Sequence, residues 1–518
     1  MTKQKKPTLL VVLDGYGLAP AGKYNAITLS KRPALDRLFE IYPNTKLGAT
    51  GTDVGLLDRR TSGSEAGHMN IGAGRIAKQD AFYITQSIED KSFFSNPALM
   101  GSFRHLQESG GKFHVMGMMG NEDSPHSEPE HFRAILRSAK ENKIKEVYCH
   151  LFTDGRDSYP KSAKRHLEHF QNIMKEEGVG RIVTLSGRFY AMDRSNNWDR
   201  LSQAYSAIVF SKGEKAKSPE EAIEKAYGAG LTDEYLTPTV IYDNKDSFIK
   251  LQDNDSLVFF NLRSDRARQF SKLFVSSNKE SALKDDMPII NRPKNLYFTA
   301  LTDFGPDLDV HTIWKGQTHP GTLPMALGKF KQLYIAETEK FAHVTYFMNG
   351  GYADPVSRED RMMIPSSKID SYAKIPQMAT PKITMNLMKN LKEEAYDFYA
   401  INFANADMVG HTGDIASTVK ACEVLDQQIE ILAKEVLKRE GNLIVTADHG
   451  NAESMFDEKT KQPHTFHTKN PVPFLIISDK IKNRKLDSGG VLGNIAPTIL
   501  EIMEVDKPQV MKKNSLLK

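Results

Sequence analysis

The chain has 518 residues and carries 69 lysines and arginines against 65 aspartates and glutamates, a formal net charge of +4. At roughly 150 residues per domain this length predicts two to four domains. A hydrophobic share of 40% and a charged share of 26% are typical of a folded globular protein. The small net charge argues against nucleic-acid or membrane partners. Two cysteines, Cys149 and Cys422, exclude a disulfide framework and predict a cytoplasmic protein.

The first predicted element is a short apolar run over residues 8–13, typical of a buried parallel strand. It ends at Asp14, which is followed by Gly-Tyr-Gly. Open α/β sheets bind ligands just beyond the carboxyl ends of their strands, so Asp14 is a candidate ligand. A cap for the next helix is an equally good interpretation of this aspartate.

Small residues surround one hydroxyl, that of Ser64, in the segment 60–75. Gly63 and Gly67 are expected to let the backbone turn sharply and to leave open space at this hydroxyl. Ser64 is therefore either a turn residue or a nucleophile that needs an activating partner. The local sequence does not decide between the two.

Strands are predicted at residues 112–119, 146–153, 181–186 and 256–262, and each runs into a polar loop. Arginine pairs two oxygens of a carboxylate or phosphate at once, so arginines at successive strand ends predict one shared anion site. For any one arginine alone a solvated surface charge is the better interpretation, but for five at three successive strand ends it is the weaker one. The candidates in these loops are His126, Arg156, Asp157, Arg188, Arg194, Arg263 and Arg266.

Further strands are predicted at 331–336, 396–403, 442–447 and 472–477, with a long helix over 415–437. Carboxylates and imidazoles near these strand ends, with Asp14, are numerous enough for two metal ions about 4 Å apart. This mixed donor set favours Mn²⁺, with Zn²⁺ and Mg²⁺ behind it, although each histidine alone could be structural. The candidates are Asp407, His411, Asp448, His449 and His467.

These segments resemble the cofactor-independent phosphoglycerate mutases. The similarity covers essentially the whole chain and is carried by five motifs in register: 64–75, 154–157, 336–340, 405–411 and 447–453. The chain departs from the family pattern in having Gly63 where asparagine is usual. It departs again in a longer, more acidic loop at 120–128.

The resemblance implies an α/β fold of two domains: an alkaline-phosphatase-like α/β sandwich at 1–79 and 314–518, interrupted by an inserted α/β transferase domain at 80–313. It implies an isomerase of glycolysis and gluconeogenesis that interconverts 3-phosphoglycerate and 2-phosphoglycerate through a phosphoserine intermediate. The expected cofactors are two Mn²⁺ ions, with Mg²⁺, Zn²⁺ or Co²⁺ as substitutes and no bisphosphoglycerate. The only expected partner is the substrate, and the chain is expected to be a monomer.

The resemblance also implies roles for the candidate residues. Ser64 would be phosphorylated, with Asp157 and Lys340 as the other catalytic residues. Asp407, His411 and His467 would hold one ion, and Asp14, Ser64, Asp448 and His449 the other. Substrate would be bound by His126, Arg156, Asp157, Arg188, Arg194, Arg263, Arg266 and Lys340.

Two alternatives stay open at this point. The first is another enzyme of the same superfamily, a phosphatase or a different phosphomutase. The second is a metal- or nucleic-acid-binding protein without enzymatic activity, against which the modest net charge argues.

Overall fold

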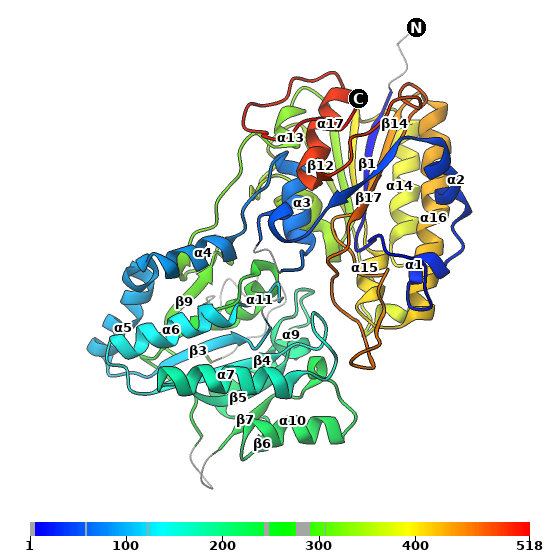
Figure 1. Cartoon of the computed structure of the whole chain (residues 1–518). Coiled ribbons are helices and arrows are strands. Elements are labelled where there is room, and N and C mark those ends of the chain that lie inside the picture. Colours follow the sequence, from blue (N-terminus) through cyan, green and yellow to red (C-terminus); the bar gives the residue numbers. More distant parts are fainter. Residues whose placement is uncertain (1–5, 57–59, 122–123, 243–247, 276–290, 306) are drawn as a thin grey trace. The chain divides into compact units, whose positions relative to one another are not determined.

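The structure is a computed structural model that describes residues 6–56, 60–121, 124–242, 248–275, 291–305 and 307–518 (Figure 1). The chain forms two compact units. Unit 1 combines Met1–Gln79 with Gln317–Lys518, and unit 2 is Asp80–Gly316. Each unit contains an eight-stranded sheet with helices, so the predicted α/β class is confirmed.

The sheet of unit 1 is mixed, with strand order β12-β11-β13-β1-β14-β17-β2-β18. Its first five strands are parallel, β17 is antiparallel to β14 and β2, and β18 is parallel to β2. The strands are β1 (Thr8–Leu13), β2 (Asn44–Gly48), β11 (Gln332–Glu337), β12 (Glu359–Ile364), β13 (Phe398–Phe403), β14 (Asn442–Thr446), β17 (Val472–Ile477) and β18 (Gly490–Val491).

The central strands of this sheet are fully buried because helices cover both faces. Figure 1 shows α14 and α16 on one side of β1 and β14, and α3 and α17 on the other. The helices are α1 (Ala26–Leu29), α2 (Pro33–Ile41), α3 (Ser64–Ala73), α13 (Leu323–Ala326), α14 (Thr380–Lys392), α15 (Asn405–Gly410), α16 (Ile415–Lys438) and α17 (Ile495–Ile502).

The topology of unit 1 collects the segments that carry the candidate ligands. Because β1, β11, β13 and β14 are parallel, the loops that follow them lie at one edge of the sheet. The loop before β17 lies at the same edge, since β17 runs in the opposite direction. A separate two-stranded ribbon, β15 (Phe456–Asp457) with β16 (Gln462–Pro463), lies between β14 and β17 in the sequence.

Unit 2 has the strand order β10-β9-β8-β3-β4-β5-β7-β6, parallel throughout except between β5 and β7. Its strands are β3 (Phe113–Met118), β4 (Val147–Thr153), β5 (Arg181–Gly187), β6 (Glu214–Ala216), β7 (Thr239–Ile241), β8 (Ser256–Phe259), β9 (Tyr297–Thr302) and β10 (His311–Trp314). Its helices are α4 (Asp80–Glu89), α5 (Pro97–Ser109), α6 (Pro129–Glu141), α7 (Ala163–Glu177), α8 (Arg188–Ala191), α9 (Trp198–Phe210), α10 (Pro219–Gly228) and α11 (Ser264–Val275).

The predicted strands are present, although the last strand before the arginines at 263 and 266 ends early, at Phe259. The apolar segment after Lys340 is a π-helical turn, His343–Phe347, packed against α3. Part of the acidic loop at 120–128 lies outside the described residues, at positions 122 and 123. Among the described helices, none combines the length and apolarity needed to cross a bilayer.

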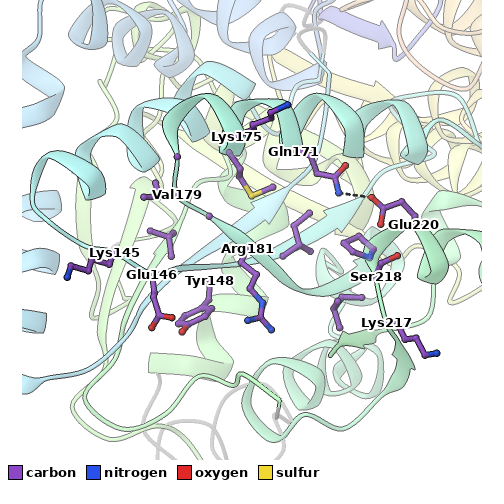
Figure 2. A pocket seen from close by; sticks show the side chains of 17 residues that line it. Lys145, Glu146, Tyr148, Gln171, Lys175, Val179, Arg181, Lys217, Ser218 and Glu220 are labelled. Atoms are coloured by element: carbon purple, nitrogen blue, oxygen red, sulfur yellow. Dashed lines mark hydrogen bonds between the residues drawn. The ribbon is translucent and has the colours of Figure 1, made fainter. Parts of the chain in front are cut away.

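A pocket of about 710 Å³ opens at the amino ends of β4 and β5 in unit 2 (Figure 2). Lys145, Lys175, Lys217 and Arg181 surround it, together with Glu146 and Glu220. The loops that carry the candidate residues follow the carboxyl ends of the same strands. This pocket therefore lies at the opposite edge of the sheet from them.

Candidate active site

Ser64 is the first residue of α3, and not part of the sharp turn that the sequence had suggested. Gly63 precedes the helix in extended backbone, with φ of −131° and ψ of 174°. Gly67 is helical, and a Cβ placed on it would lie only 2.6 Å from the Cβ of Asp448. The expectation of a turn was therefore wrong: Gly67 serves the close approach of α3 to the loop after β14.

The Ser64 hydroxyl is buried and meets three side chains from three strand ends. Its Oγ lies 3.0 Å from Asp14 Oδ1 after β1 and 3.0 Å from His449 Nε2 after β14. It also lies 2.7 Å from Lys340 Nζ, in the short helical turn after β11. The structure thus places the candidate nucleophile against acidic, imidazole and ammonium groups.

Lys340 connects the two ends of this cluster. Its buried ammonium group lies 2.7 Å from Asp14 Oδ1 and 2.6 Å from Asp407 Oδ2, as well as contacting Ser64. An ammonium group only donates hydrogen bonds, so all three oxygens act as acceptors toward it. The lysine therefore offsets part of the negative charge gathered at this edge of the sheet.

The three buried carboxyls respond differently to this environment. Burial raises the pKa of Asp14, and repulsion from Asp448 raises it further, against the attraction of Lys340. Burial opposes ionisation of Asp407, but His411 and Lys340 outweigh it and hold the Asp407 pKa well below its usual value. For Asp448 the pKa is likewise lowered against burial, chiefly by His449. Three buried carboxyl groups this close together are stable in their ionised form only with positive charge nearby.

His411 and His467 converge on one oxygen of Asp407. The Nδ1 atoms donate to backbone carbonyls, from His411 to Thr465 at 2.6 Å and from His467 to Ser62 at 2.7 Å. A carbonyl oxygen only accepts, so each ring donates its Nδ1–H, and Nε2 is the atom left to bind a proton or a metal ion. The Nε2 atoms lie 3.2 Å apart, at 3.1 Å and 3.2 Å from Asp407 Oδ1.

His449 has the same arrangement, with Nδ1 3.3 Å from the carbonyl of Gly450 and Nε2 directed at Ser64. Among the described residues of unit 1, two groups have potential ligand atoms that lie within 4.8 Å of one another. The groups are Asp407, His449 and His467, and Asp14, His68 and Asp448.

His68 belongs to this cluster but was not singled out from the sequence. Its Nδ1 lies 2.8 Å from the Ser64 carbonyl and 3.2 Å from Asp448 Oδ2, and its Nε2 lies 3.2 Å from the Asn402 amide nitrogen. Nδ1 must carry the proton that the carbonyl accepts, and Nε2 then accepts from Asn402. Both nitrogens are occupied, so His68 holds Asp448 and α3 in place. In the sequence, the only indication of this role is the spacing of four residues from Ser64, which places both residues on one face of a helix.

In unit 2, residues from three strand ends form a second buried cluster. His126 Nε2 lies 2.9 Å from Asp157 Oδ2 and 3.1 Å from Arg188 Nη2. Arg188 also pairs with Asp157, and with Asp154 at 2.7 Å. Burial, reinforced by Arg188, lowers the pKa of His126 well below its usual value, so this imidazole is neutral. Asp154 had been overlooked as a site residue; its Oδ1 also accepts from the backbone N–H of Asp157 at 3.0 Å.

The remaining arginines lie in the neighbouring loops of unit 2 and, for Arg266, in the first turn of α11. Arg194 Nη1 lies 2.5 Å from Asp265 Oδ2, and Arg263 Nε lies 3.3 Å from Asp265 Oδ1. Asp265 thus joins two of the predicted substrate residues. Arg266 donates to the Met192 carbonyl at 3.3 Å, and Arg156 lies 3.7 Å from Glu234.

Comparison with known proteins decides the family. The model of the metalloenzyme superfamily matches residues 6–507. A 2,3-bisphosphoglycerate-independent phosphoglycerate mutase of Clostridium perfringens (strain SM101 / Type A) is 42% identical over 516 residues, 99% of each chain. The chain belongs to the 2,3-bisphosphoglycerate-independent phosphoglycerate mutases. A second member, from Clostridioides difficile (strain 630), is 43% identical over 99% of each chain.

A solved member of the family has the same fold. The crystal structure of Leishmania mexicana phosphoglycerate mutase at low cobalt concentration matches with a TM-score of 0.90 at 26% identity. The match covers 100% of this chain and 98% of that one. The resemblance to phosphoglycerate mutases stated from the five sequence motifs is therefore confirmed.

The metalloenzyme superfamily implies bound metal, and the donor atoms of unit 1 fit it. The Nε2 atoms of His411 and His467 and an oxygen of Asp407 point at one another, an arrangement that needs a cation among them, either a metal ion or a proton. A backbone carbonyl accepting the other ring proton is the usual support of a metal-ligating histidine. Imidazole with carboxylate suits divalent transition metals.

Proposed function

We propose that this chain interconverts 3-phosphoglycerate and 2-phosphoglycerate without bisphosphoglycerate, through a phosphoserine on Ser64. One observation carries this proposal: the Ser64 hydroxyl lies within 3.0 Å of Asp14, His449 and Lys340. The names of the relatives at 42% and 43% identity support the substrate and the reaction. They disfavour the alternative of a phosphatase or another phosphomutase.

The surroundings of Ser64 suit it to accept a phosphoryl group. Lys340 donates to the Ser64 oxygen, so the serine proton is directed at Asp14 or His449. A bond then forms between Oγ and phosphorus while the bond from phosphorus to the substrate oxygen breaks. Lys340 stabilises the negative charge on the oxygens involved. The same exchange in reverse, toward the other hydroxyl of glycerate, gives the product.

The phosphoryl group also meets the first turn of α3. Gly63 has no side chain to cap this helix, and the N–H groups of a first turn have no partner within a helix. An anion at such a position is favoured by these donors and by the helix dipole. A phosphate on the first residue of α3 would be stabilised in this way.

Two divalent ions complete the proposal for unit 1. Asp407, His411 and His467 would hold one, and Asp14, Ser64, Asp448 and His449 the other. When bound, such ions supply positive charge that neutralises the phosphoryl group and lowers the pKa of a hydroxyl. We propose Mn²⁺ as the metal, with Mg²⁺, Zn²⁺ or Co²⁺ able to replace it; the solved relative crystallised with cobalt supports such replacement.

Unit 2 would bind the glycerate part of the substrate, and unit 1 would act as the metal-binding domain. The forked guanidinium groups suit a carboxylate, and Asp157 beside neutral His126 is placed to move the proton of a substrate hydroxyl. The residues proposed to bind substrate are His126, Arg156, Asp157, Arg188, Arg194, Arg263, Arg266 and Lys340.

The decisive experiment follows 3-phosphoglycerate by ³¹P nuclear magnetic resonance with Mn²⁺ and without bisphosphoglycerate. Formation of 2-phosphoglycerate supports the proposal, and free phosphate as the main product would support the phosphatase instead. Acid quenching followed by mass spectrometry should find phosphate on Ser64.

We also propose a cytoplasmic monomer. The free, buried state of Cys149 and Cys422 supports a reducing compartment. Light scattering during gel filtration would give the mass of the particle and test the monomer directly.

A further inference from the structure

Glu453 is a buried side chain for which the proposed reaction has no use. It follows His449 by four residues, and 3% of its surface is exposed. Its Oε2 accepts hydrogen bonds from the backbone N–H of Gly17 at 3.1 Å and of Asn451 at 2.8 Å. Its Oε1 accepts from the hydroxyl of Thr468 and from the amide of Asn470 at 3.0 Å. One carboxyl group thus binds four donors.

These donors come from three loops that carry proposed metal ligands. Gly17 lies three residues after Asp14, and Asn451 lies two residues after His449. Thr468 comes directly after His467. The loops after β1 and β14 and the loop before β17 are therefore joined through a single side chain.

The backbone is shaped around this carboxyl. A Cβ placed on Gly17 would overlap the carboxyl group of Glu453, and a Cβ placed on Gly450 would overlap its Oε1. Two glycines in two different loops thus leave room for the carboxyl to lie directly against the main chain. A side chain that merely filled space would not require glycine at these two positions.

The connection reaches a fourth ligand-bearing segment. The side-chain amide of Asn451, whose backbone Glu453 binds, donates to Asp407 Oδ1 at 3.2 Å. That oxygen is the one on which His411 and His467 converge. Glu453 thereby fixes Asn451, and through it the orientation of Asp407.

We infer that Glu453 is a positioning residue that sets the metal affinity of unit 1 by holding four ligand-bearing segments in register. The inference rests on the proposed function, because it assumes metal at these ligands. Groups that orient ligands typically contribute about 10- to 100-fold to metal affinity. A residue that only stabilised the fold would change the unfolding temperature but not this affinity.

The test compares Glu453→Gln with Glu359→Gln. Glu359 is also buried in unit 1 and also binds several donors, from Asn349 and Arg361, but it begins β12 at the opposite edge of the sheet. The Mn²⁺ dissociation constant of each metal-free full-length protein is measured by calorimetry. The unfolding temperature of the metal-free proteins is recorded alongside.

For Glu453→Gln we expect the Mn²⁺ dissociation constant to rise at least about tenfold. For Glu359→Gln we expect it to stay within about twofold of the unmodified protein, since its hydrogen bonds reach no proposed ligand. Equal affinities of the Glu453 variant and the unmodified protein would overturn the inference, as would an equal loss in both variants. Failure of the unmodified protein to bind Mn²⁺ would instead overturn the proposed function.

A second variant keeps the test decisive if Glu453→Gln does not fold. Thr468→Val keeps the size of the side chain and removes the hydroxyl that Glu453 accepts from. We expect it to fold and to bind Mn²⁺ about threefold more weakly, as the loss of one hydrogen bond predicts. Unchanged affinity in this variant would also overturn the inference.

Discussion

His411 and His467 direct their Nε2 atoms at each other across 3.2 Å, because each ring donates its Nδ1–H to a backbone carbonyl. Both nitrogens also face the same oxygen of Asp407. Rotating either ring would break the buried hydrogen bond from its Nδ1 to the backbone carbonyl, so the two Nε2 atoms stay directed at one another. This edge of the sheet is therefore built for a cation.

Removal of metal by a chelator should abolish mutase activity and lower the unfolding temperature of the protein. Without the metal ion, only protons can offset the repulsion among the Nε2 atoms of His411 and His467 and the carboxylate of Asp407. Addition of Mn²⁺ at a hundred times its dissociation constant should return about 2.7 kcal/mol of stability. Activity and calorimetric unfolding are measured on the same sample.

Asp407→Asn provides the comparison for metal removal. The amide keeps the shape of the side chain but withdraws the charge shared by His411, His467 and Lys340. Its unfolding temperature should respond much less to Mn²⁺ than that of the unmodified protein. An equal response in both would place the metal elsewhere.

Ser64→Ala should reduce mutase activity by at least about a thousandfold, in the range seen when a nucleophile is removed. The fold should persist, since alanine favours the first turn of α3. Turnover is followed by ³¹P nuclear magnetic resonance. Ser478→Ala is the matched control: its buried hydroxyl donates to Asn442 at the opposite edge of the same sheet, and its activity should stay within about twofold. Normal turnover by the Ser64 variant would exclude a phosphoserine mechanism.

The convergence of Asp14, Asp407 and Asp448 on one edge could be predicted from the sequence. Each follows a short, continuously apolar segment, and such segments form parallel strands whose carboxyl ends lie together. His467 is different, because it precedes its strand. It reaches the same edge only since β17 is antiparallel to β14, a direction that an apolar pattern does not reveal.

Other features depend on contacts that no local pattern records. The requirement for glycine at position 67 comes from the approach of Asp448, almost four hundred residues away in sequence. His68 could have been noticed only once Ser64 was known to begin a helix, since the spacing of four residues has meaning there. Glu453 was visible within a motif, but its four donors come from three separate loops.

Arg188→Lys should lower kcat/KM by about a hundredfold, because a lysine cannot replace a guanidinium that binds two groups in one plane. Arg188 pairs with Asp154 and Asp157 and contacts His126, all in unit 2. Its charge also contributes to the lowered pKa of His126. Initial rates over a range of 3-phosphoglycerate concentrations give kcat/KM.

The control for this variant is Arg133→Lys on α6, whose ion-pair partners are the exposed Glu130 and Glu176 and, at 3.7 Å, the buried Glu177. Surface pairs of this kind contribute about 0–1 kcal/mol, so its kcat/KM should be unaltered. The Mn²⁺ affinity of both variants should match the unmodified protein, because the proposed ligands are in unit 1. Loss of metal binding in Arg188→Lys would refute the assignment of all metal ligands to unit 1.

Glu337→Gln should stabilise unit 1 above neutral pH and have little effect in acid. Glu337 is buried at the end of β11, where it accepts from Ser366 at 2.7 Å and from the N–H of Ala379 at 3.2 Å. Burial raises its pKa to about 7, and of the neighbouring charges Glu339 raises it while Lys340 lowers it.

The sign of this effect follows from proton binding. Because its folded pKa is above the unfolded value, the folded state binds more protons, so the contribution of Glu337 to stability is full below about pH 4.5 and is lost as the pH rises through about 7. Glutamine resembles the protonated form at every pH. A shift of one pKa unit corresponds to about 1.4 kcal/mol. Between pH 4.5 and pH 8 the free energy of unfolding of the variant should therefore rise by roughly 3 kcal/mol relative to that of the unmodified protein.

Urea unfolding of both proteins at several pH values, followed by circular dichroism, measures this gain. Both tryptophans of the chain, Trp198 and Trp314, lie in unit 2, so their fluorescence reports the unfolding of that unit. The fluorescence transition, which reports unit 2, should shift equally with pH in the two proteins. The pH-dependent difference in stability should appear in the circular dichroism transition of unit 1. A constant difference across the pH range would show that Glu337 has the same proton affinity in the folded and unfolded chain.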